Sequence, residues 1–205
     1  PDLLLPEGTY LISDTKKWWR QKAEEYLSAR KIPIDGLYIC TEGTYKCRII
    51  IPYYDRAGKL IYWNARHIFP QTKIRYLGPP KEVGVGKTDV VYVPGKWSPP
   101  GDLLHVCEGE FNAMSLHLSG LNAAACGGKN MSDKQALILA DFRICLCLDR
   151  DKAGRSGTSF MSNAISSLEV ASRTREKLFF VIPPAPYKDW NEMYVKKREA
   201  IVHYY

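Results

Sequence analysis

Acidic side chains are the residues of this sequence whose types and spacing are best suited to chemistry, and they occur in three groups. The groups are residues 108–110 (EGE), 149–151 (DRD) and 189–192 (DWNE). Mg²⁺ prefers oxygen ligands and usually binds one or two carboxylates together with waters and phosphate oxygens. In phosphoryl and nucleotidyl transfer, such ions bridge phosphates and stabilise the attacking and leaving oxygens. The three groups therefore predict a divalent metal site that acts on phosphates.

Each of the first two acidic groups directly follows a predicted strand. Residues 103–107 and 143–149 are short apolar runs, and strand-like and helical patterns alternate along this half of the chain. A β-α-β-α-β-α-β series predicts an α/β fold with a four-stranded parallel sheet flanked by helices. In open parallel sheets, sites form beyond the carboxyl ends of the strands. Glu108 and Asp149 are expected there, and Asp151 points the same way as Asp149 if the strand geometry continues.

The other elements of this half follow from periodicity and end signals. One helix is expected after the first acidic group, and a second from Ser132, because Gln135 three residues later completes a capping-box pattern. A third helix is expected over 154–168, and further strands over 122–126 and 177–182. A single acidic residue at a helix start is as consistent with a cap as with a metal ligand. The metal site is therefore predicted from the three groups together.

The first half of the chain has a different pattern. A helix over 15–30 is followed by strand-like runs at 48–54, 60–67 and 90–93, and residues 55–58 (DRAG) form a predicted turn. This half is expected to be α+β with small sheets. The Pro- and Gly-rich stretch 93–101 is the predicted boundary. The predicted divisions are a basic subdomain over 1–100, a metal-binding domain over 101–195 and a tail over 196–205.

Positive charge is concentrated in the first half. Residues 1–100 contain 16 Lys and Arg against 10 Asp and Glu, whereas residues 101–205 contain 13 against 12. This excess predicts a polyanion partner such as nucleic acid or nucleotide, with a solubilising surface as the alternative. A hydrophobic content of 45% favours a folded core, and no apolar run approaches the roughly 18 residues of a membrane span. We expect a soluble cytoplasmic protein without a membrane partner.

The six cysteines do not have the spacing of a zinc site. Zinc ribbons pair their cysteines as C-x2-C or C-x4-C, whereas the close spacings here are seven positions (Cys40 to Cys47) and two positions (Cys145 to Cys147). In a strand, the last two share one face and are expected to pack as small hydrophobic residues. No zinc is expected in this chain.

At the acidic groups the sequence resembles the Toprim domain of DnaG-type primases, which has a glutamate after the first strand and Asp-x-Asp after the third. The matching segments are VCEGEFNAMSLHLSGLNAAACGG, RICLCLDRDKAGRSG and KDWNE. The resemblance implies that Glu108, Asp149 and Asp151 are catalytic metal-site residues and that Glu108 is a candidate general base. It also implies that Asp189 holds a second metal ion, so the expected cofactor is a pair of Mg²⁺ or Mn²⁺ ions. One departure is Asn112, which stands where the family often has Asp.

The first half resembles the basic subdomain of the same enzymes. The similar segments are YLSARKI, RIIIP, DRAGK, NAR and RYLG, so the resemblance covers roughly residues 20–195. It implies that Arg48, Arg66, Arg75 and Lys87 contact phosphates of the template or nucleotide, with ordinary surface charge as the alternative for each. The zinc-binding module that precedes the core in the family is missing from this sequence.

The activity that the resemblance implies is DNA priming. A primase core makes short RNA primers on single-stranded DNA from ribonucleoside triphosphates by metal-dependent nucleotidyl transfer. The expected partners are a replicative helicase and a zinc-binding module in cis or in trans, in a bacterial cell or a phage-infected host. Two alternatives remain open: another Toprim enzyme that cleaves phosphodiesters, such as a nuclease or topoisomerase, or a non-catalytic fragment that binds single-stranded DNA.

Overall fold

A computed structural model describes residues 3–128, 130–150 and 178–197. The chain divides into two compact units, Pro1–Gly86 and Lys87–Tyr205. The predicted helix over 154–168, the predicted tail and Asp151 lie outside the described residues.

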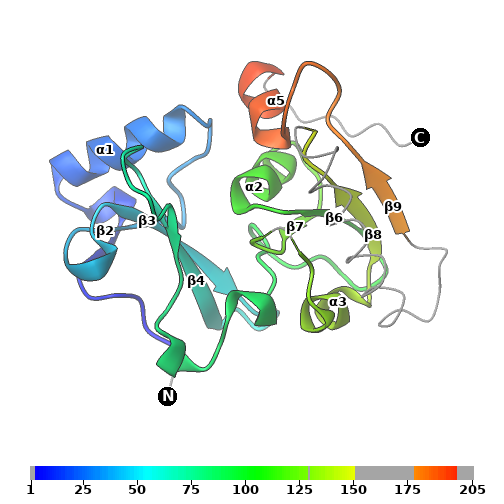
Figure 1. Cartoon of the computed structure of the whole chain (residues 1–205), viewed down its shortest axis with the longest axis horizontal. Coiled ribbons are helices and arrows are strands. Elements are labelled where there is room, and N and C mark those ends of the chain that lie inside the picture. Colours follow the sequence, from blue (N-terminus) through cyan, green and yellow to red (C-terminus); the bar gives the residue numbers. More distant parts are fainter. Residues whose placement is uncertain (1–2, 129, 151–177, 198–205) are drawn as a thin grey trace. The chain divides into compact units, whose positions relative to one another are not determined.

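The first unit contains a five-stranded antiparallel sheet in the order β1-β2-β3-β4-β5 (Figure 1). Its strands are β1 (Thr9–Leu11), β2 (Tyr38–Cys40), β3 (Arg48–Tyr54), β4 (Leu60–His67) and β5 (Tyr76–Leu77). Its helices are α1 (Lys17–Ser28) and the single-turn η1 (Ile12–Asp14), η2 (Gly43–Tyr45) and η3 (Lys81–Val83). The expected helix and the first two expected strands of this half are therefore present.

The β3–β4 hairpin is the longest strand pair of this unit. The predicted turn forms at residues 55–58, where Asp55 Oδ1 accepts hydrogen bonds from the backbone amides of Ala57 and Lys59 at 2.9 Å each. Gly58 has a φ of +82°, a value that favours glycine. Strand β3 is buried along almost its whole length. Its Ile-rich sequence suits that position, since β-branched side chains pack well in a buried strand.

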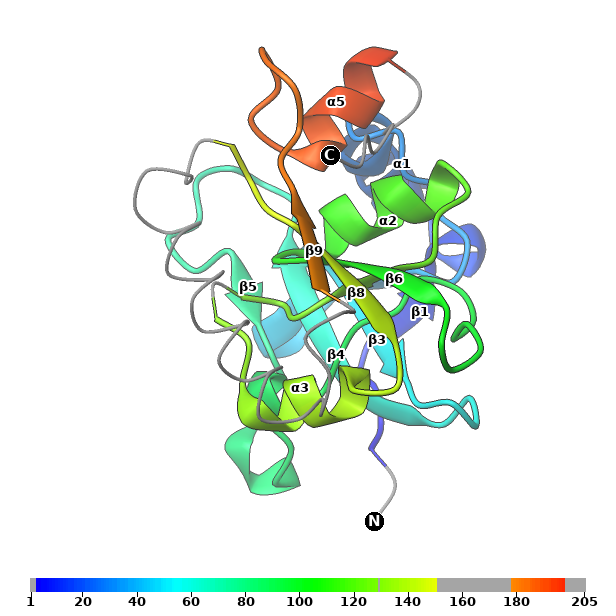
Figure 2. The same ribbon diagram turned by 90° about the vertical axis from the view of Figure 1, so that its right-hand side faces the viewer.

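The second unit contains a four-stranded parallel sheet in the order β7-β6-β8-β9, as expected. Its strands are β6 (Leu103–Cys107), β7 (Ala123–Ala125), β8 (Arg143–Cys147) and β9 (Leu178–Val181). Its helices are η4 (Lys87–Asp89), α2 (Glu110–Leu118), α3 (Asp133–Leu139) and α5 (Trp190–Lys197). Helices α2 and α3 lie on opposite faces of the sheet, and α5 lies beside α2 (Figure 2).

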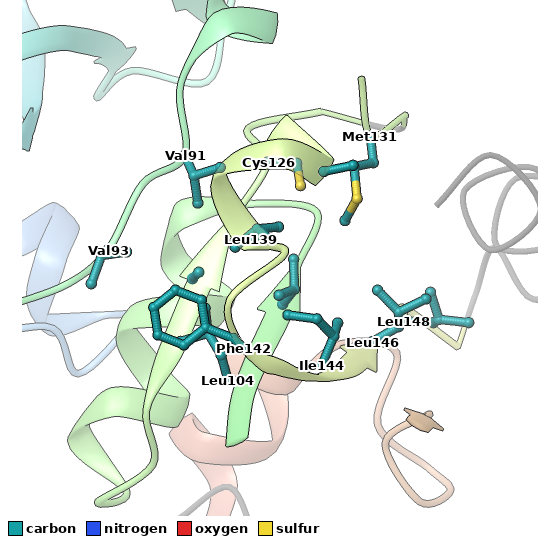
Figure 3. Packing of buried hydrophobic residues seen from close by; sticks show 13 residues of the cluster. Val91, Val93, Leu104, Cys126, Met131, Leu139, Phe142, Ile144, Leu146 and Leu148 are labelled. Atoms are coloured by element: carbon teal, nitrogen blue, oxygen red, sulfur yellow. The ribbon is translucent and has the colours of Figure 1, made fainter. Parts of the chain in front are cut away.

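The core between α3 and the sheet is built from alternate strand residues (Figure 3). Leu104, Ile144 and Leu146 point to this face, where Leu139 and Phe142 cover them. Cys126 belongs to the same cluster, and burial raises the pKa of its thiol to about 12, so the side chain packs as a neutral apolar group.

The segment before the predicted boundary belongs to the second unit. Residues 90–93 were expected as a strand of the first half, but they make only an isolated antiparallel bridge between Tyr92 and Ala125. Gln135 Nε2 reaches back to the carbonyl oxygens of Lys87, Val90 and Cys126 at 2.8–3.1 Å. The boundary between the two units therefore lies N-terminal to the stretch 93–101 in the sequence, because these hydrogen bonds attach residues 87–93 to α3 and β7.

We expect Gln135→Ala to lower the free energy of unfolding by roughly 3 kcal/mol. The side chain is fully buried, and its loss leaves buried carbonyl oxygens without a donor at about 1–3 kcal/mol each. It also breaks the capping box, because Gln135 Oε1 accepts from the Ser132 amide at 3.1 Å and this acceptor is lost. Urea unfolding measures the effect. The matched control is Lys134→Ala, because the neighbouring Lys134 forms an exposed ion pair worth about 0–1 kcal/mol; equal losses in the two variants would contradict the role of Gln135.

None of the helices in the described part of the chain is long and apolar enough to cross a membrane.

Candidate active site

Glu108 and Asp149 lie beyond the carboxyl ends of neighbouring parallel strands. Cys107 at the end of β6 pairs with Cys147 at the end of β8, and the two acidic residues follow these positions by one and two residues. The chain leaves β6 for β7 on one side and later returns to β8 on the other, so the strand order reverses between β6 and β8. Ligand crevices of open α/β sheets form at such a reversal. The structure therefore brings these two predicted residues to the same edge of the sheet.

Both carboxylates are buried, with 4% exposure for Glu108 and 9% for Asp149. Asp149 Oδ1 accepts a hydrogen bond of 2.9 Å from Asn112 Nδ2 on helix α2. The loop around Asp149 is fixed on both sides, since Leu148 N donates to Val181 O at 2.9 Å and Arg150 N donates to Lys188 O at 2.7 Å. Asp149 is therefore held in a defined position between α2 and the segment that follows β9.

Asp189 lies at the N-terminus of α5. Its Oδ1 accepts from the amide of Glu192 at 2.7 Å, which is the geometry of a helix cap. Glu192 in turn accepts from the Lys188 amide at 2.8 Å, and this hydrogen bond holds the pKa of the Glu192 carboxyl below its usual value. One oxygen of Asp189 thus stabilises α5, and a role as metal ligand depends on the other.

Glu110 is a second buried carboxylate after β6, and sequence reasoning assigned it no individual role. It is 2% exposed in the first turn of α2. Burial raises the pKa of Tyr92, and the negative charge of Glu110 raises it further, so the two side chains interact. The signal in the sequence was its place in the group 108–110, two residues from Glu108.

The end of the Lys87 side chain lies next to Gly128, shortly after β7. A side chain at Gly128 would meet Lys87 Nζ at 3.2 Å, so the lysine covers this glycine at the same edge of the sheet where Glu108 lies. The edge thus combines buried acidic residues with an exposed cation.

The donor set fits a divalent cation. Buried carboxylates are costly unless a cation or hydrogen bonds compensate them, and carboxylate oxygens are the ligands that Mg²⁺ prefers. Within residues 3–128, 130–150 and 178–197, no three His, Cys, Asp or Glu side chains come together as a metal-binding group. The predicted third ligand, Asp151, lies outside these ranges, so the described carboxylates form one part of the predicted set.

A basic pocket of about 290 Å³ lies in the first unit. It is lined by Tyr26, Arg30, Arg66, His67, Ile68, Phe69, Pro70 and Arg75. Arg66 Nε donates to Tyr26 Oη at 2.7 Å, and the Arg66 guanidinium lies 4.6 Å from the centre of the Tyr76 ring. Arg30 stacks on Tyr26 at 3.9 Å. Two predicted arginines, Arg66 and Arg75, therefore share a pocket with Arg30, which sequence reasoning missed.

Arg48 is placed differently from the other predicted arginines. It is 5% exposed, and its guanidinium donates to the carbonyl oxygens of Ala65, Ile74 and Arg75 at 2.9–3.3 Å. Burial lowers the pKa of this guanidinium. Arg48 thus holds the chain before β5 against β4, and a direct phosphate contact would cost these hydrogen bonds.

Comparisons with known proteins match both units. Residues 105–194 match the Toprim-like family. The DNA primase of Mycoplasma genitalium is 25% identical over 162 residues, which are 76% of this chain and 26% of the relative. The DNA primase of Thermotoga maritima is 26% identical over 162 residues, which are 76% of this chain and 27% of the relative. The chain thus spans about a quarter of the length of these curated relatives.

Solved structures share the fold at low identity. The structure of the DnaG primase catalytic domain bound to single-stranded DNA has a TM-score of 0.61 and 20% identity, covering 89% of this chain and 69% of that one. The zinc binding and RNA polymerase domains of Aquifex aeolicus primase have a TM-score of 0.59 and 22% identity, covering 85% of this chain and 43% of that one. The mixed architecture seen here, an antiparallel sheet followed by a four-stranded parallel sheet, is therefore that of the DnaG catalytic core.

Proposed function

We propose that this chain, a relative of the DnaG-type DNA primases that carries a Toprim domain, is a primase catalytic core that synthesises short RNA primers on single-stranded DNA. The observation that carries the proposal is the placement of Glu108 and Asp149 beyond the carboxyl ends of β6 and β8. Two buried carboxylates at a strand-order reversal suit metal-dependent chemistry on phosphates.

In this proposal Glu108, Asp149 and Asp151 hold Mg²⁺ or Mn²⁺, and Asp189 holds a second ion. Bound divalent ions supply stabilisation of the negative charge that develops on phosphate oxygens. The primer 3′-hydroxyl attacks the α-phosphorus of the incoming ribonucleotide, pyrophosphate leaves, and Glu108 accepts the hydroxyl proton as general base. Asn112 orients Asp149 through its amide.

In this scheme the cationic residues bind phosphate groups of the nucleotide and the template. Lys87, which lies at the edge of the parallel sheet, contacts the triphosphate. Arg66 and Arg75 in the basic pocket contact the template or nucleotide backbone, with Arg30 beside them. Backbone contacts of this kind provide affinity without sequence selection.

The proposed partners are single-stranded DNA and ribonucleoside triphosphates. We further propose a replicative helicase and a zinc-binding module, in cis or in trans, and a cytoplasmic location in a bacterial cell or a phage-infected host. One structural relative was solved bound to single-stranded DNA, which supports the template as the first of these partners to test.

A single assay separates the proposed activity from its alternatives. The protein is incubated with labelled ribonucleotides, Mg²⁺ or Mn²⁺ and single-stranded templates of varied sequence, and the products are resolved by length. Template-dependent RNA that is lost on chelation supports the proposal. Shortened or nicked DNA would instead identify a nuclease or topoisomerase-like enzyme, and binding without any product would identify a non-catalytic fragment.

The basic pocket gives a prediction for DNA binding. Arg75→Ala should weaken binding of single-stranded DNA and reduce the slope of log K against log salt by about 0.7, because one phosphate contact is lost. Arg66→Ala should do the same and also loses the bond to Tyr26. Fluorescence anisotropy over a salt series measures both quantities. The control is Lys17→Ala, because Lys17 is an exposed cation at the start of α1 outside the pocket. If all three variants show the same slope, neither arginine contacts a phosphate and both are ordinary surface charges.

A further inference from the structure

We infer that Asn112 is a positioning residue that sets the orientation of Asp149 and connects it to helix α5; this inference rests on the proposed metal site. Asn112 is 9% exposed on α2. Its Nδ2 donates to Asp149 Oδ1 at 2.9 Å, and its Oδ1 accepts from the amide of Asn191 at 3.0 Å. An amide is suited to this place because one end faces an acceptor and the other faces a donor.

The orientation of the Asn112 amide is fixed by its two partners. An ionised carboxylate only accepts hydrogen bonds, and a backbone N–H only donates them. If the amide were rotated by half a turn, its oxygen would face Asp149 and its NH₂ group would face the Asn191 amide. Both contacts would then be repulsive, so a single arrangement remains. A carboxylate at position 112 has no hydrogen to donate to Asp149 when ionised, and it adds a second negative charge next to it.

A second pair of hydrogen bonds braces the same junction. Asn191 Nδ2 donates to Ser115 Oγ at 2.9 Å, and Ser115 Oγ donates to Phe111 O at 2.8 Å within α2. Asn112 and Ser115 are three residues apart and therefore lie on one face of α2. Two side chains of α2 thus contact a single residue of α5, which fixes the start of that helix.

This junction connects two of the proposed metal-binding carboxylates. Asp149 contacts Asn112, Asn112 contacts Asn191, and Asn191 follows Asp189 by two residues in the capped turn of α5. Asp149 and Asp189 are therefore connected through one buried amide. We attribute to Asn112 the spacing and orientation of these carboxylates, a task in which residues outside the ligand set commonly contribute 10–100-fold to metal affinity or activity.

The test measures the affinity of the full chain for Mn²⁺ by electron paramagnetic resonance, in the absence of nucleotide and DNA. Asn112→Ala and the similarly sized Asn112→Leu should weaken Mn²⁺ binding by about 10–100-fold. In primer extension, the Mg²⁺ concentration for half-maximal activity should rise by a similar factor. Circular dichroism and thermal unfolding establish whether each variant is folded. If Asn112→Ala does not fold, Asn112→Leu supplies the measurement.

The matched control is Ser119→Ala, which removes a hydrogen bond of 2.8 Å from Ser119 Oγ to Ser115 O at the C-terminal end of α2, outside the junction. It should lower the melting temperature and leave Mn²⁺ affinity unchanged. Folded Asn112 variants with wild-type Mn²⁺ affinity would overturn the positioning role while leaving the metal site intact. If Asp149→Asn binds Mn²⁺ with the same affinity as the wild-type protein, the proposed metal site is overturned, and the positioning role with it.

Discussion

Replacing Asp149 with Asn should reduce nucleotidyl transfer by about a thousandfold or more at saturating Mg²⁺. Asp149 is one of the carboxylates that we propose to hold the metal, and metal ions supply several kcal/mol of charge stabilisation in such reactions. Since each 1.36 kcal/mol is a factor of ten in rate, a loss of about 4 kcal/mol corresponds to roughly this effect. Asp151→Asn should act in the same way. The measurement is incorporation of labelled ribonucleotide into RNA on a primed template.

The loss of activity should not come from unfolding. An Asn at position 149 still presents an oxygen to Asn112 Nδ2, and one charge is removed from a region that also contains the buried Glu108. Removing one of two crowded like charges tends to stabilise a protein that has no metal bound. The matched control is Asp141→Asn, because Asp141 is exposed and precedes β8, whereas Asp149 follows it. Near wild-type activity of Asp149→Asn at saturating Mg²⁺ would falsify the metal assignment.

Extension of a supplied RNA primer should exceed unprimed synthesis on the same template by at least about a hundredfold. Extension needs the metal site and a track for the template, whereas initiation must also bring two free nucleotides together. Holding two reactants in position can lower a reaction barrier by about 7–11 kcal/mol in favourable cases. Even part of that free energy, if it is missing for the two initiating nucleotides, gives a large difference between the rates of initiation and extension. The Aquifex aeolicus primase that shares this fold was solved with a zinc binding domain, and the cysteine spacings here do not form such a module.

The experiment compares the two reactions with one template, one nucleotide pool and one metal concentration. Adding a candidate zinc-binding module in trans should raise unprimed synthesis selectively and leave extension nearly unchanged. Efficient unprimed synthesis by the chain alone would contradict the division of labour, because it would mean that this core positions both initiating nucleotides itself.

The parallel sheet was predictable because its strands are short apolar runs, each followed by an acidic, glycine-containing or proline-containing segment. Alternation of such runs with helical patterns admits few topologies, and the order β7-β6-β8-β9 follows one of them. The start of the second helix could even be placed to the residue, since the Ser132–Gln135 capping box is a local signal. Local signals of this kind need no knowledge of tertiary contacts.

The segment 90–93 was placed wrongly because an apolar run does not identify its partner. The run was read as a strand of the first half, but Gln135 and Ala125 hold it in the second unit. Arg48 illustrates the same difficulty, since nothing in its local sequence distinguishes an arginine that binds backbone carbonyls from one that faces solvent. Arg30 carried a usable signal, because Tyr26 lies four residues before it in the helix expected over 15–30, and the two side chains stack.

The candidate site was predictable as a set of acidic residues but not as an arrangement. Glu108 and Asp149 could be assigned to strand ends, which parallel topology brings to one edge. The contact of Asn112 with Asp149 depends on how α2 lies against the sheet, and sequence reasoning noted Asn112 only as a departure from a usual acidic residue. The metal roles of Glu108, Asp149, Asp151 and Asp189 remain predictions.

The bridge between Tyr92 and Ala125 affects how the second unit behaves when it is produced alone. Its two hydrogen bonds, 2.9 and 2.8 Å long, occupy backbone groups of β7, the outermost strand on that side of the sheet. Uncovered outer strands recruit strands from other molecules and promote aggregation. A fragment beginning at residue 101 would lack Tyr92 and expose three alanines with no charged side chain to deter pairing. A fragment beginning at Lys87 would keep this protection, and we expect it to remain monomeric at higher concentration.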